Sequence, residues 1–316
     1  MKVQEALVHG IRLLKEAGVE SPQLDCAVLL AQALGITKER VYVEAEREIE
    51  PARLLLFQQM LERRVRREPV QYITGTREFM GLDFEVGPGV LVPRPETEVL
   101  VEVAQCLIKE SGRWPHAQAE GCVRTADAEG RAGPAGGYML ADIGTGSGAI
   151  AVVLAGFLGT LEDRRRVSRV FATDISTEAL ETAKRNARRH HVQDRIEFLE
   201  GDMWQPLEGL GLAGKLDAVV SNPPYISTAE METLQPEVRL FEPRQALDGG
   251  EDGLDYYRIL ARGAPKFLRP GGFLALEVGA FQSEPLRALM DAAGLCNCRA
   301  VKDLQGIPRV VYGFRA

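Results

Sequence analysis

Residues 138–148 read Tyr-Met-Leu-Ala-Asp-Ile-Gly-Thr-Gly-Ser-Gly, an apolar run that ends in glycines at three alternate positions. The run predicts a buried strand, and the apolar residues that follow predict a helix, so the glycines lie in the connecting loop. Glycine lets the backbone turn sharply and approach a ligand closely. The sequence therefore predicts a ligand-binding loop, although a purely structural turn would show the same glycines. The loop consists of Gly144, Thr145, Gly146, Ser147 and Gly148.

The class of ligand is narrowed by what this loop lacks. Its spacing is GxGxG, whereas dinucleotide-binding loops have GxGxxG, and no Lys-Ser or Lys-Thr follows to make a phosphate-binding loop. Nothing in the sequence supports binding of a pyrophosphate here.

Strands and helices alternate from Tyr138 onward. Strands are predicted at 138–143, 170–173, 196–199, 218–221 and 273–278, with helices at 149–158, 177–190, 254–267 and 284–293. Alternation of this kind predicts an α/β fold with a doubly wound, mostly parallel sheet. The chain then closes with two segments, 296–301 and 309–314, that we expect to pair antiparallel.

Three further parts are distinguished by composition. Residues 1–70 have apolar residues at helical spacing and predict a small helical N-terminal domain. Residues 71–95 are punctuated by glycine and predict a β-hairpin linker to a catalytic domain at 96–316. Within that domain, residues 111–137 are rich in Gly, Ala, Arg and Glu, and predict a flexible surface insertion.

Polar residues follow the second and third predicted strands. Asp174 ends the second strand, where a carboxylate can accept hydrogen bonds from both hydroxyls of a ribose; capping of the next helix is the alternative. After the third strand, Asp202 can accept a hydrogen bond from an adenine amine, and Met203 and Trp204 can flank the ring. Because the ends of parallel strands meet at one edge, we expect a single crevice there. A sulfonium cofactor needs no phosphate site and matches this set.

The fourth predicted strand ends in Asn222-Pro223-Pro224-Tyr225. An amide nitrogen is a poor nucleophile because its lone pair is delocalised, and two acceptors aimed at its N–H bonds can hold it. The Asn222 side-chain oxygen and the Pro223 carbonyl can supply these acceptors, and successive prolines fix their position. Tyr225 can pack on the flat face of the bound group. We therefore predict methyl transfer to a planar nitrogen, with a rigid structural turn as the alternative.

Composition excludes several other classes. The net charge is −7 with a pI near 5.4, and residues 1–70 carry 11 basic and 11 acidic side chains, so the excess lies on 71–316. An acidic catalytic portion argues against stable nucleic acid binding and favours a protein substrate. No apolar run reaches the ~20 residues that span a bilayer. The five cysteines include no CxxC pair, so they predict neither a disulfide framework nor a metal site. Their odd number is typical of a protein of the reducing cytoplasm.

The motifs together resemble the protein-(glutamine-N5) methyltransferases of the PrmC/HemK type, which act on bacterial release factors. The resemblance covers nearly all of residues 70–316. The motifs that carry it are Gln71–Gly75, Glu78-Phe79, Val92–Glu98 (VPRPETE), Asp142–Gly148, Ala172–Ser176, Ser221–Ile226 (SNPPYI), Glu242-Pro243-Arg244, Ala246-Leu247, Gly249-Gly250, Asp252–Asp255 and Pro270-Gly271-Gly272.

This resemblance implies a class I, Rossmann-like methyltransferase that uses S-adenosyl-L-methionine. It also implies a helical N-terminal domain that docks a peptide chain release factor, whose Gly-Gly-Gln glutamine is methylated. The Gly144–Gly148 loop, Asp174, Met203 and Asn222 would contact the cofactor, and 222–225 would hold the glutamine. The family often has an aromatic residue where this chain has Met203, and Trp204 is the alternative for that role.

Two other substrates use related chemistry. A ribosomal protein glutamine methyltransferase would share the catalytic motif and differ in docking. DNA adenine-N6 methyltransferases also carry NPPY, but base flipping is normally accompanied by a basic surface, and the densest basic run of this sequence is short, with four arginines at 63–67. We expect that run to be a solvated helix end or a contact with an acidic release factor.

Overall fold

The computed structural model describes residues 1–110, 137–161 and 168–316. The predicted insertion at 111–137 lies outside the described residues, apart from Gly137. The chain divides into two compact units. The first contains Met1–Arg77, Val86–Pro88 and Leu234–Glu242, and the second contains Glu78–Glu85, Gly89–Thr233 and Pro243–Ala316.

The first unit is helical. Its helices are α1 (Val3–Glu16), α2 (Pro22–Leu34), α3 (Lys38–Val43), α4 (Pro51–Val65), α5 (Val70–Thr74) and α9 (Pro236–Phe241). Proline stands in the first turn of α2, α4 and α9, where its missing N–H has no helical partner to lose. Leu14, Leu30 and Phe57 are fully or almost fully buried in the core of this unit.

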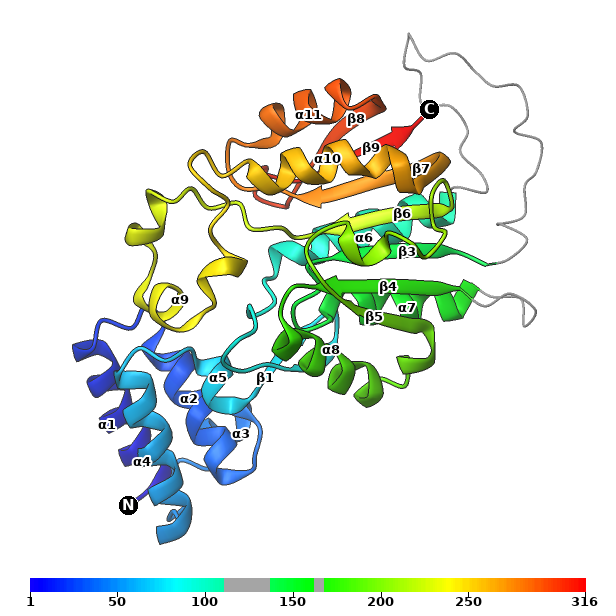
Figure 1. Cartoon of the computed structure of the whole chain (residues 1–316). Helices are drawn as coiled ribbons and strands as arrows, with labels where there is room; N and C mark the ends of the chain where they lie inside the picture. The colour runs from blue at the N-terminus through cyan, green and yellow to red at the C-terminus, as the bar shows by residue number, and fades with distance from the viewer. Residues whose placement is uncertain (111–136, 162–167) are drawn as a thin grey trace. The chain divides into compact units, whose positions relative to one another are not determined.

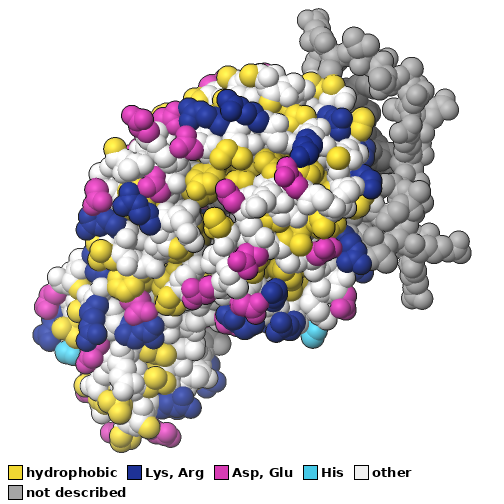
Figure 2. Space-filling view, in the orientation of Figure 1, with side chains coloured by type: hydrophobic (Ala, Val, Ile, Leu, Met, Phe, Trp, Pro, Cys, Tyr) yellow, Lys and Arg dark blue, Asp and Glu magenta, His cyan; other side chains and the backbone are white. Residues whose placement is uncertain are grey.

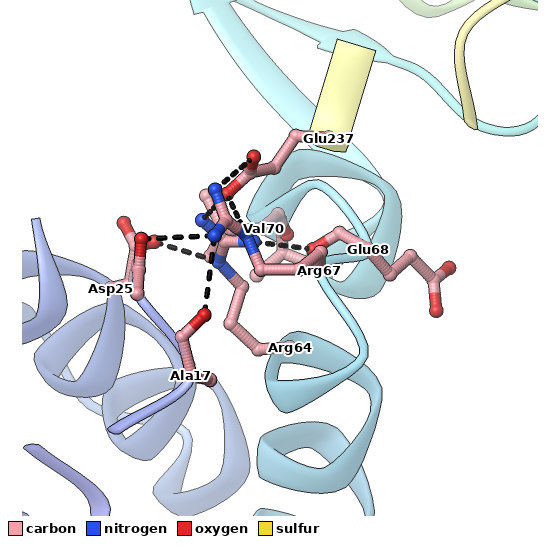
Figure 3. A network of polar contacts seen from close by, with 9 residues as sticks. Ala17, Asp25, Arg64, Arg67, Glu68, Val70 and Glu237 are labelled. Carbon is pink, nitrogen blue, oxygen red and sulfur yellow. Dashed lines mark hydrogen bonds and ion pairs between the residues drawn. The ribbon is translucent and has the colours of Figure 1, made fainter. Parts of the chain in front are cut away.

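A buried ionic cluster joins α2, α4 and α9 within the helical unit (Figure 3). Arg64 is 5% exposed and donates from Nε to Asp25 at 2.8 Å and from Nη2 to Glu237 at 2.7 Å. Arg67 donates to both oxygens of the same Glu237, at 2.8 and 2.6 Å. The cluster attaches 234–242 to the helical unit, although the preceding residues of the chain, up to Thr233, belong to the other unit.

The segment before the predicted hairpin differs from expectation. Gln71–Thr74, which we assigned to the hairpin linker, belongs to the short helix α5 (Val70–Thr74), and the hairpin consists of β1 (Thr76–Phe79) and β2 (Leu82–Glu85). The β-branched Val70, Ile73 and Thr74 suggested a strand, but Ile73 is buried among the helices of the first unit.

The second unit contains the predicted doubly wound sheet, which is confirmed. Its strands are β3 (Met139–Ile143), β4 (Arg169–Asp174), β5 (Ile196–Glu200), β6 (Leu216–Ser221), β7 (Leu268–Glu277), β8 (Leu295–Lys302) and β9 (Pro308–Arg315). They lie in the order β5-β4-β3-β6-β7-β9-β8, as Figure 1 shows. β9 runs antiparallel to both of its neighbours, β7 and β8, so the expected closing antiparallel pair is present.

Helices cover both faces of this sheet. They are α6 (Glu96–Glu110), α7 (Ala149–Leu161), α8 (Thr177–Arg189), α10 (Asp255–Phe267) and α11 (Ser283–Ala292). Successive strand residues point to opposite faces: in β6, Ala218 and Val220 join a core with residues of α6, α7 and α8, while Val219 joins a core with residues of α10 and α11. Because both faces are buried at the centre of the sheet, β3 and β6 are mostly apolar, whereas the edge strands β5 and β8 also carry charged residues.

The described surface is electrically mixed. On the face drawn in Figure 2, basic and acidic side chains are interspersed rather than gathered by sign. Within residues 1–110, 137–161 and 168–316, no helix is both long enough and apolar enough to span a membrane.

Candidate active site

A pocket in the second unit lies at the carboxyl ends of four neighbouring strands. Asp202 follows β5, Asp174 ends β4, the glycine loop follows β3 and Asn222 follows β6. All of these line the pocket except Gly148, the last residue of the glycine loop. The chain order reverses between β3 and β6, since β4 and β5 continue on one side of β3 and β6 lies on the other. Ligands of open α/β sheets bind at such a switch point.

The glycine loop after β3 has a backbone that depends on its glycines. Gly144, Gly146 and Gly148 have φ of +73°, +55° and +80°, which side chains rarely tolerate. A Cβ at Gly148 would lie 2.8 Å from the Cβ of Ala183 in α8, so this glycine also lets α8 approach. A Cβ at Gly144 or Gly146 would meet no atom within 4 Å, so on this side the loop borders open space.

Asp174 connects this loop with the start of α8. One carboxylate oxygen accepts the Gly146 N–H and the other accepts the Ser176 N–H, both at 2.9 Å. The N-cap of α8 is Ser176, whose own hydroxyl accepts a backbone N–H of the helix, so Asp174 is not the capping residue. Each Asp174 oxygen keeps a second lone pair, which is available to a hydroxyl in the pocket. Burial raises the pKa of Asp174, and the backbone N–H groups oppose that rise.

Asp142, at the end of β3, is a carboxyl group without exposure to solvent. Its Oδ2 accepts the Thr145 hydroxyl at 2.6 Å, while Oδ1 has no partner among the described residues. Burial raises its pKa to about 7, although the Thr145 hydrogen bond favours ionisation. The sequence motif contains Asp142, but we assigned it no role.

The residues after β5 divide between the pocket and the core. Asp202 and Met203 line the pocket, and Met203 has a positive φ of 44°. Trp204 is 8% exposed, stacks on Phe267 at 5.0 Å between ring centroids, and donates Nε1–H to the Ile259 carbonyl. Trp204 therefore belongs to the core beneath α10, and we leave it out of the proposed cofactor contacts.

Asn222 and Pro224 line the pocket, whereas Pro223 and Tyr225 are not among its lining residues. The backbone of Tyr225 is held by Gln282, whose Nε2 donates to the Tyr225 carbonyl at 2.9 Å. The side chain of Tyr225 is directed to Glu277, with 3.4 Å between the hydroxyl and Oε1. The roles that we gave to the Pro223 carbonyl and the Tyr225 ring stay predictions.

Asn222 has a partner that the sequence did not reveal. Its Nδ2 donates to the Thr97 hydroxyl of α6 at 3.1 Å, across 125 residues of chain. Its Oδ1 makes no hydrogen bond with the described residues, so it is left for a ligand in the pocket. Thr97 itself lines the pocket and lies in the VPRPETE motif. The VPRPETE motif indicated that this segment is important, but the sequence alone did not show which of its side chains reaches the site.

Other lining residues were also missed. They include Gly89, Val90, Leu91 and Pro93 before α6, Ile175 and Ala179 near the start of α8, and Pro243, Gln245, Ala246 and Tyr256. Tyr256 supplies an aromatic ring to the pocket, which the helix pattern of 254–267 did not distinguish from an ordinary surface position.

The charges that line the pocket restrict its ligand. Asp174 and Asp202 are acidic, and none of the lining residues that the structure describes is Lys or Arg. Phosphate groups need cations or a helix N-terminus with a phosphate-binding loop, and the loop here lacks that pattern. A pocket lined by carboxylates and by no Lys or Arg can accept hydrogen bonds from ribose hydroxyls and can stabilise a positively charged group. The residues present therefore fit a sulfonium nucleoside and do not fit a dinucleotide.

Comparisons with known proteins agree with this chemistry. The model of the PrmC N-terminal domain matches residues 5–75, and that of the methyltransferase small domain matches residues 134–250. The release factor glutamine methyltransferase of Moorella thermoacetica is 43% identical over all of this chain and 99% of its own length. That of Geobacter sulfurreducens is 42% identical, covering 95% and 92% respectively.

Among solved structures, the catalytic domain of hMettl16, in complex with the MAT2A 3′UTR hairpin 6, superposes with a TM-score of 0.53. The match covers 78% of this chain and 80% of that one at 16% identity, which shows a shared fold and no more.

Proposed function

We propose that this chain, which belongs to the release factor glutamine methyltransferase family, methylates a glutamine in a peptide chain release factor. The methyl group would be added to the side-chain amide nitrogen (N5) of that glutamine. The methyl donor is S-adenosyl-L-methionine, and the target is the glutamine of a Gly-Gly-Gln motif. The observation that carries the proposal is the placement of Asn222 in the same pocket as the glycine loop and Asp174.

The cofactor would be held by residues that line the pocket beside the glycine loop. Asp174 would accept the ribose hydroxyls with its remaining lone pairs, and Asp202 and Met203 would contact the adenine. When bound, S-adenosyl-L-methionine supplies an electrophilic methyl group on a positively charged sulfur. The acidic residues that line the pocket, Asp174 and Asp202, would stabilise that charge.

Asn222 orients the substrate. Its Oδ1 accepts one N–H of the glutamine amide, and the Pro223 carbonyl is the expected acceptor for the second. Both acceptors stand on a backbone that two prolines restrict, so little reorganisation is needed when the amide arrives. Orientation of this kind lowers a barrier by up to ~7–11 kcal/mol, and we assign most of the rate to it. The proton of the methylated nitrogen, which is strongly acidic, leaves to water.

The test uses radiolabelled S-adenosyl-L-methionine with the purified protein and three separate acceptors: a release factor, a ribosomal protein fraction and DNA. We expect label only in the release factor, at the Gly-Gly-Gln glutamine. Label in ribosomal protein alone would select the first alternative substrate, and label in DNA alone would overturn the assignment to protein.

Substitution of Asn222 tests the carrying observation. Asn222→Ala removes the acceptor from the pocket but none of the cofactor contacts proposed for the glycine loop and Asp174. We expect turnover to be lost and the dissociation constant of S-adenosylhomocysteine, measured by calorimetry, to stay close to the wild-type value. Turnover retained in full would remove Asn222 from the mechanism.

A further inference from the structure

Tyr256 is an aromatic residue of the pocket that has no role in the proposed mechanism. It lies in the first turn of α10, is partly exposed, and lines the pocket together with Asp202 and Met203. Among the lining residues that the structure describes, no other is aromatic. Because the ring of Trp204 is in the core, Tyr256 is the residue that can offer a flat aromatic face to a ligand in this pocket.

A hydrogen bond attaches α10 to the turn that follows β5. The Nε1–H of Trp204 donates to the Ile259 carbonyl at 3.0 Å, and the Trp204 ring stacks on Phe267 at the end of the same helix. The indole also lies against the backbone of Gly263, where an added Cβ would be 2.5 Å from Trp204 Cδ1. These contacts fix the position of α10 relative to Met203, the residue before Trp204.

The helical spacing of α10 connects these contacts with the pocket. Residues three, four and seven positions apart lie on one face of a helix, so Tyr256, Leu260 and Gly263 form one stripe along α10. Gly263 meets Trp204, and Leu260 is fully buried in the same core cluster as Trp204. One turn closer to the N-terminus, the stripe reaches Tyr256, which lines the pocket. Tyr256 and the turn that contains Met203 therefore border the same part of the pocket.

The three residues at this part of the pocket suit a purine base. A base has flat faces on which aromatic side chains stack, and the polarizable thioether of a methionine packs well against an aromatic ring. Tyr256 and Met203 supply these two kinds of contact, and the carboxylate of Asp202 can accept a hydrogen bond from an amine at the edge of the base.

We propose that Tyr256 is the aromatic residue of the adenine site, and that its ring packs on the adenine of S-adenosyl-L-methionine beside Met203. This inference rests on the cofactor of the proposed function. Trp204, which the sequence suggested for this contact, instead holds α10 in the position from which Tyr256 makes it.

The first experiment measures binding without any methyl acceptor. S-adenosylhomocysteine is titrated by calorimetry into the full-length wild type, Tyr256→Leu and Tyr256→Phe. Loss of an aromatic ring that stacks on a base weakens binding by about 5- to 150-fold, so the Kd of Tyr256→Leu should rise by a factor in this range. Tyr256→Phe keeps the ring and should bind as the wild type does. An unchanged Kd in Tyr256→Leu would overturn the proposal.

A ligand without the base shows which part of the cofactor the ring contacts. S-ribosylhomocysteine has the ribose and the amino acid part of S-adenosylhomocysteine but no adenine, and competition with S-adenosylhomocysteine measures its affinity. Because it offers no base to the ring, Tyr256→Leu should bind it as well as the wild type does. An equal loss of affinity for both ligands would show that Tyr256 acts on the ribose or on the shape of the pocket, and the adenine contact would be refuted.

Tyr138→Leu is the matched control for the loss of a tyrosine ring. Like Tyr256, Tyr138 is partly exposed and belongs to the second unit, but it precedes β3 at the opposite edge of the sheet and does not line the pocket. The same substitution there should leave the affinity for S-adenosylhomocysteine unchanged. Equal losses in Tyr138→Leu and Tyr256→Leu would contradict a specific contact of Tyr256 with the cofactor.

Turnover distinguishes a contact with the cofactor from one with the protein substrate. With a release factor as acceptor, Tyr256→Leu should raise KM for S-adenosyl-L-methionine by a factor similar to that for Kd. KM for the release factor, and kcat at saturating cofactor, should stay near the wild-type values. A raised KM for the release factor with an unchanged affinity for S-adenosylhomocysteine would place Tyr256 at the substrate instead.

The binding measurements also separate this inference from the proposed function. A wild type that binds S-adenosylhomocysteine but methylates no release factor would refute the proposed substrate, while the loss of affinity in Tyr256→Leu would still support the adenine contact. A wild type that does not bind S-adenosylhomocysteine would refute the cofactor and this inference with it. Equal binding by the wild type and Tyr256→Leu would refute the inference alone.

Discussion

The Glu237 carboxylate accepts a hydrogen bond from Arg64 Nη2 at 2.7 Å, although 173 residues separate the two in the chain (Figure 3). Arg64 is 5% exposed and also holds Asp25, and Arg67 pairs with the same Glu237, so two guanidinium groups neutralise two buried carboxylates. Glu237 belongs to α9, which follows the NPPY loop, yet it is packed in the helical unit. The ion pairs of Glu237 with Arg64 and Arg67 therefore attach a late segment of the chain to the first helices.

Arg64→Met should destabilise the helical unit. Methionine fills the volume but leaves Asp25 and part of Glu237 without a partner, and removal of one member of a buried ion pair costs about 3–5 kcal/mol. Chemical denaturation, followed by the helical signal in circular dichroism, measures the loss. Lys184→Met, at the exposed pair with Glu181, is the control and should change stability little. Equal effects of the two substitutions would show that burial of the cluster adds nothing.

Asp174→Ala should weaken cofactor binding. The substitution removes the acceptor of the Gly146 and Ser176 N–H groups as well as the proposed ribose contact. Each hydrogen bond to a charged group contributes about 1.5–3 kcal/mol, so the loss of even one raises the dissociation constant by roughly tenfold or more. Isothermal titration with S-adenosylhomocysteine measures it.

Asp194→Ala serves as the control for that titration, because Asp194 is exposed in the short helix Gln193–Arg195 and does not line the pocket. Its affinity should match that of the wild type. An unchanged affinity in Asp174→Ala would place the ribose elsewhere.

The strands of the sheet and the residues at their carboxyl ends could be predicted because they depend on the pattern of apolar and polar residues along a short stretch of chain. Apolar runs such as 218–221 are bounded by polar or glycine residues, so the strand ends could be located within a few residues. Polar residues that follow parallel strands must share an edge, and Asp174 and Asn222 indeed line one pocket.

Features that depend on turns and distant contacts could not be predicted in this way. Met203 and Trp204 are adjacent, and a positive φ at Met203 decides which of them faces the pocket. Neither a period of 2 nor one of 3.6 describes such a turn. Likewise, the contact of Thr97 with Asn222 joins α6 to the end of β6, and a single sequence shows no signal for that pairing.

Gly148→Ala should destabilise the second unit more than a positive φ alone explains. Left-handed backbone costs a side chain about 1–2 kcal/mol, and overpacking against Ala183 adds about 1–3 kcal/mol. Gly294→Ala is the matched control, since Gly294 has a φ of +85° but no atom within 4 Å of an added Cβ. Thermal unfolding of both variants measures the difference. Equal melting temperatures would mean that α8 moves away without cost.

The buried Asp142 predicts a pH dependence of stability with a definite sign. Its folded-state pKa of about 7 lies above the ordinary value of 3.8, so the unfolded state ionises first as pH rises. The group therefore costs nothing below pH 3.8, and its penalty grows with pH until the folded state also ionises near pH 7. Asp142→Asn cannot ionise, and asparagine keeps an acceptor for the Thr145 hydroxyl.

The stability of Asp142→Asn relative to the wild type should accordingly increase between pH 4 and pH 7 and level off above it. Melting temperatures of the two proteins, measured side by side across this range, give the difference and cancel the titration of all other groups. A difference that does not change with pH would mean that Asp142 is ionised throughout, with water or an ion at Oδ1.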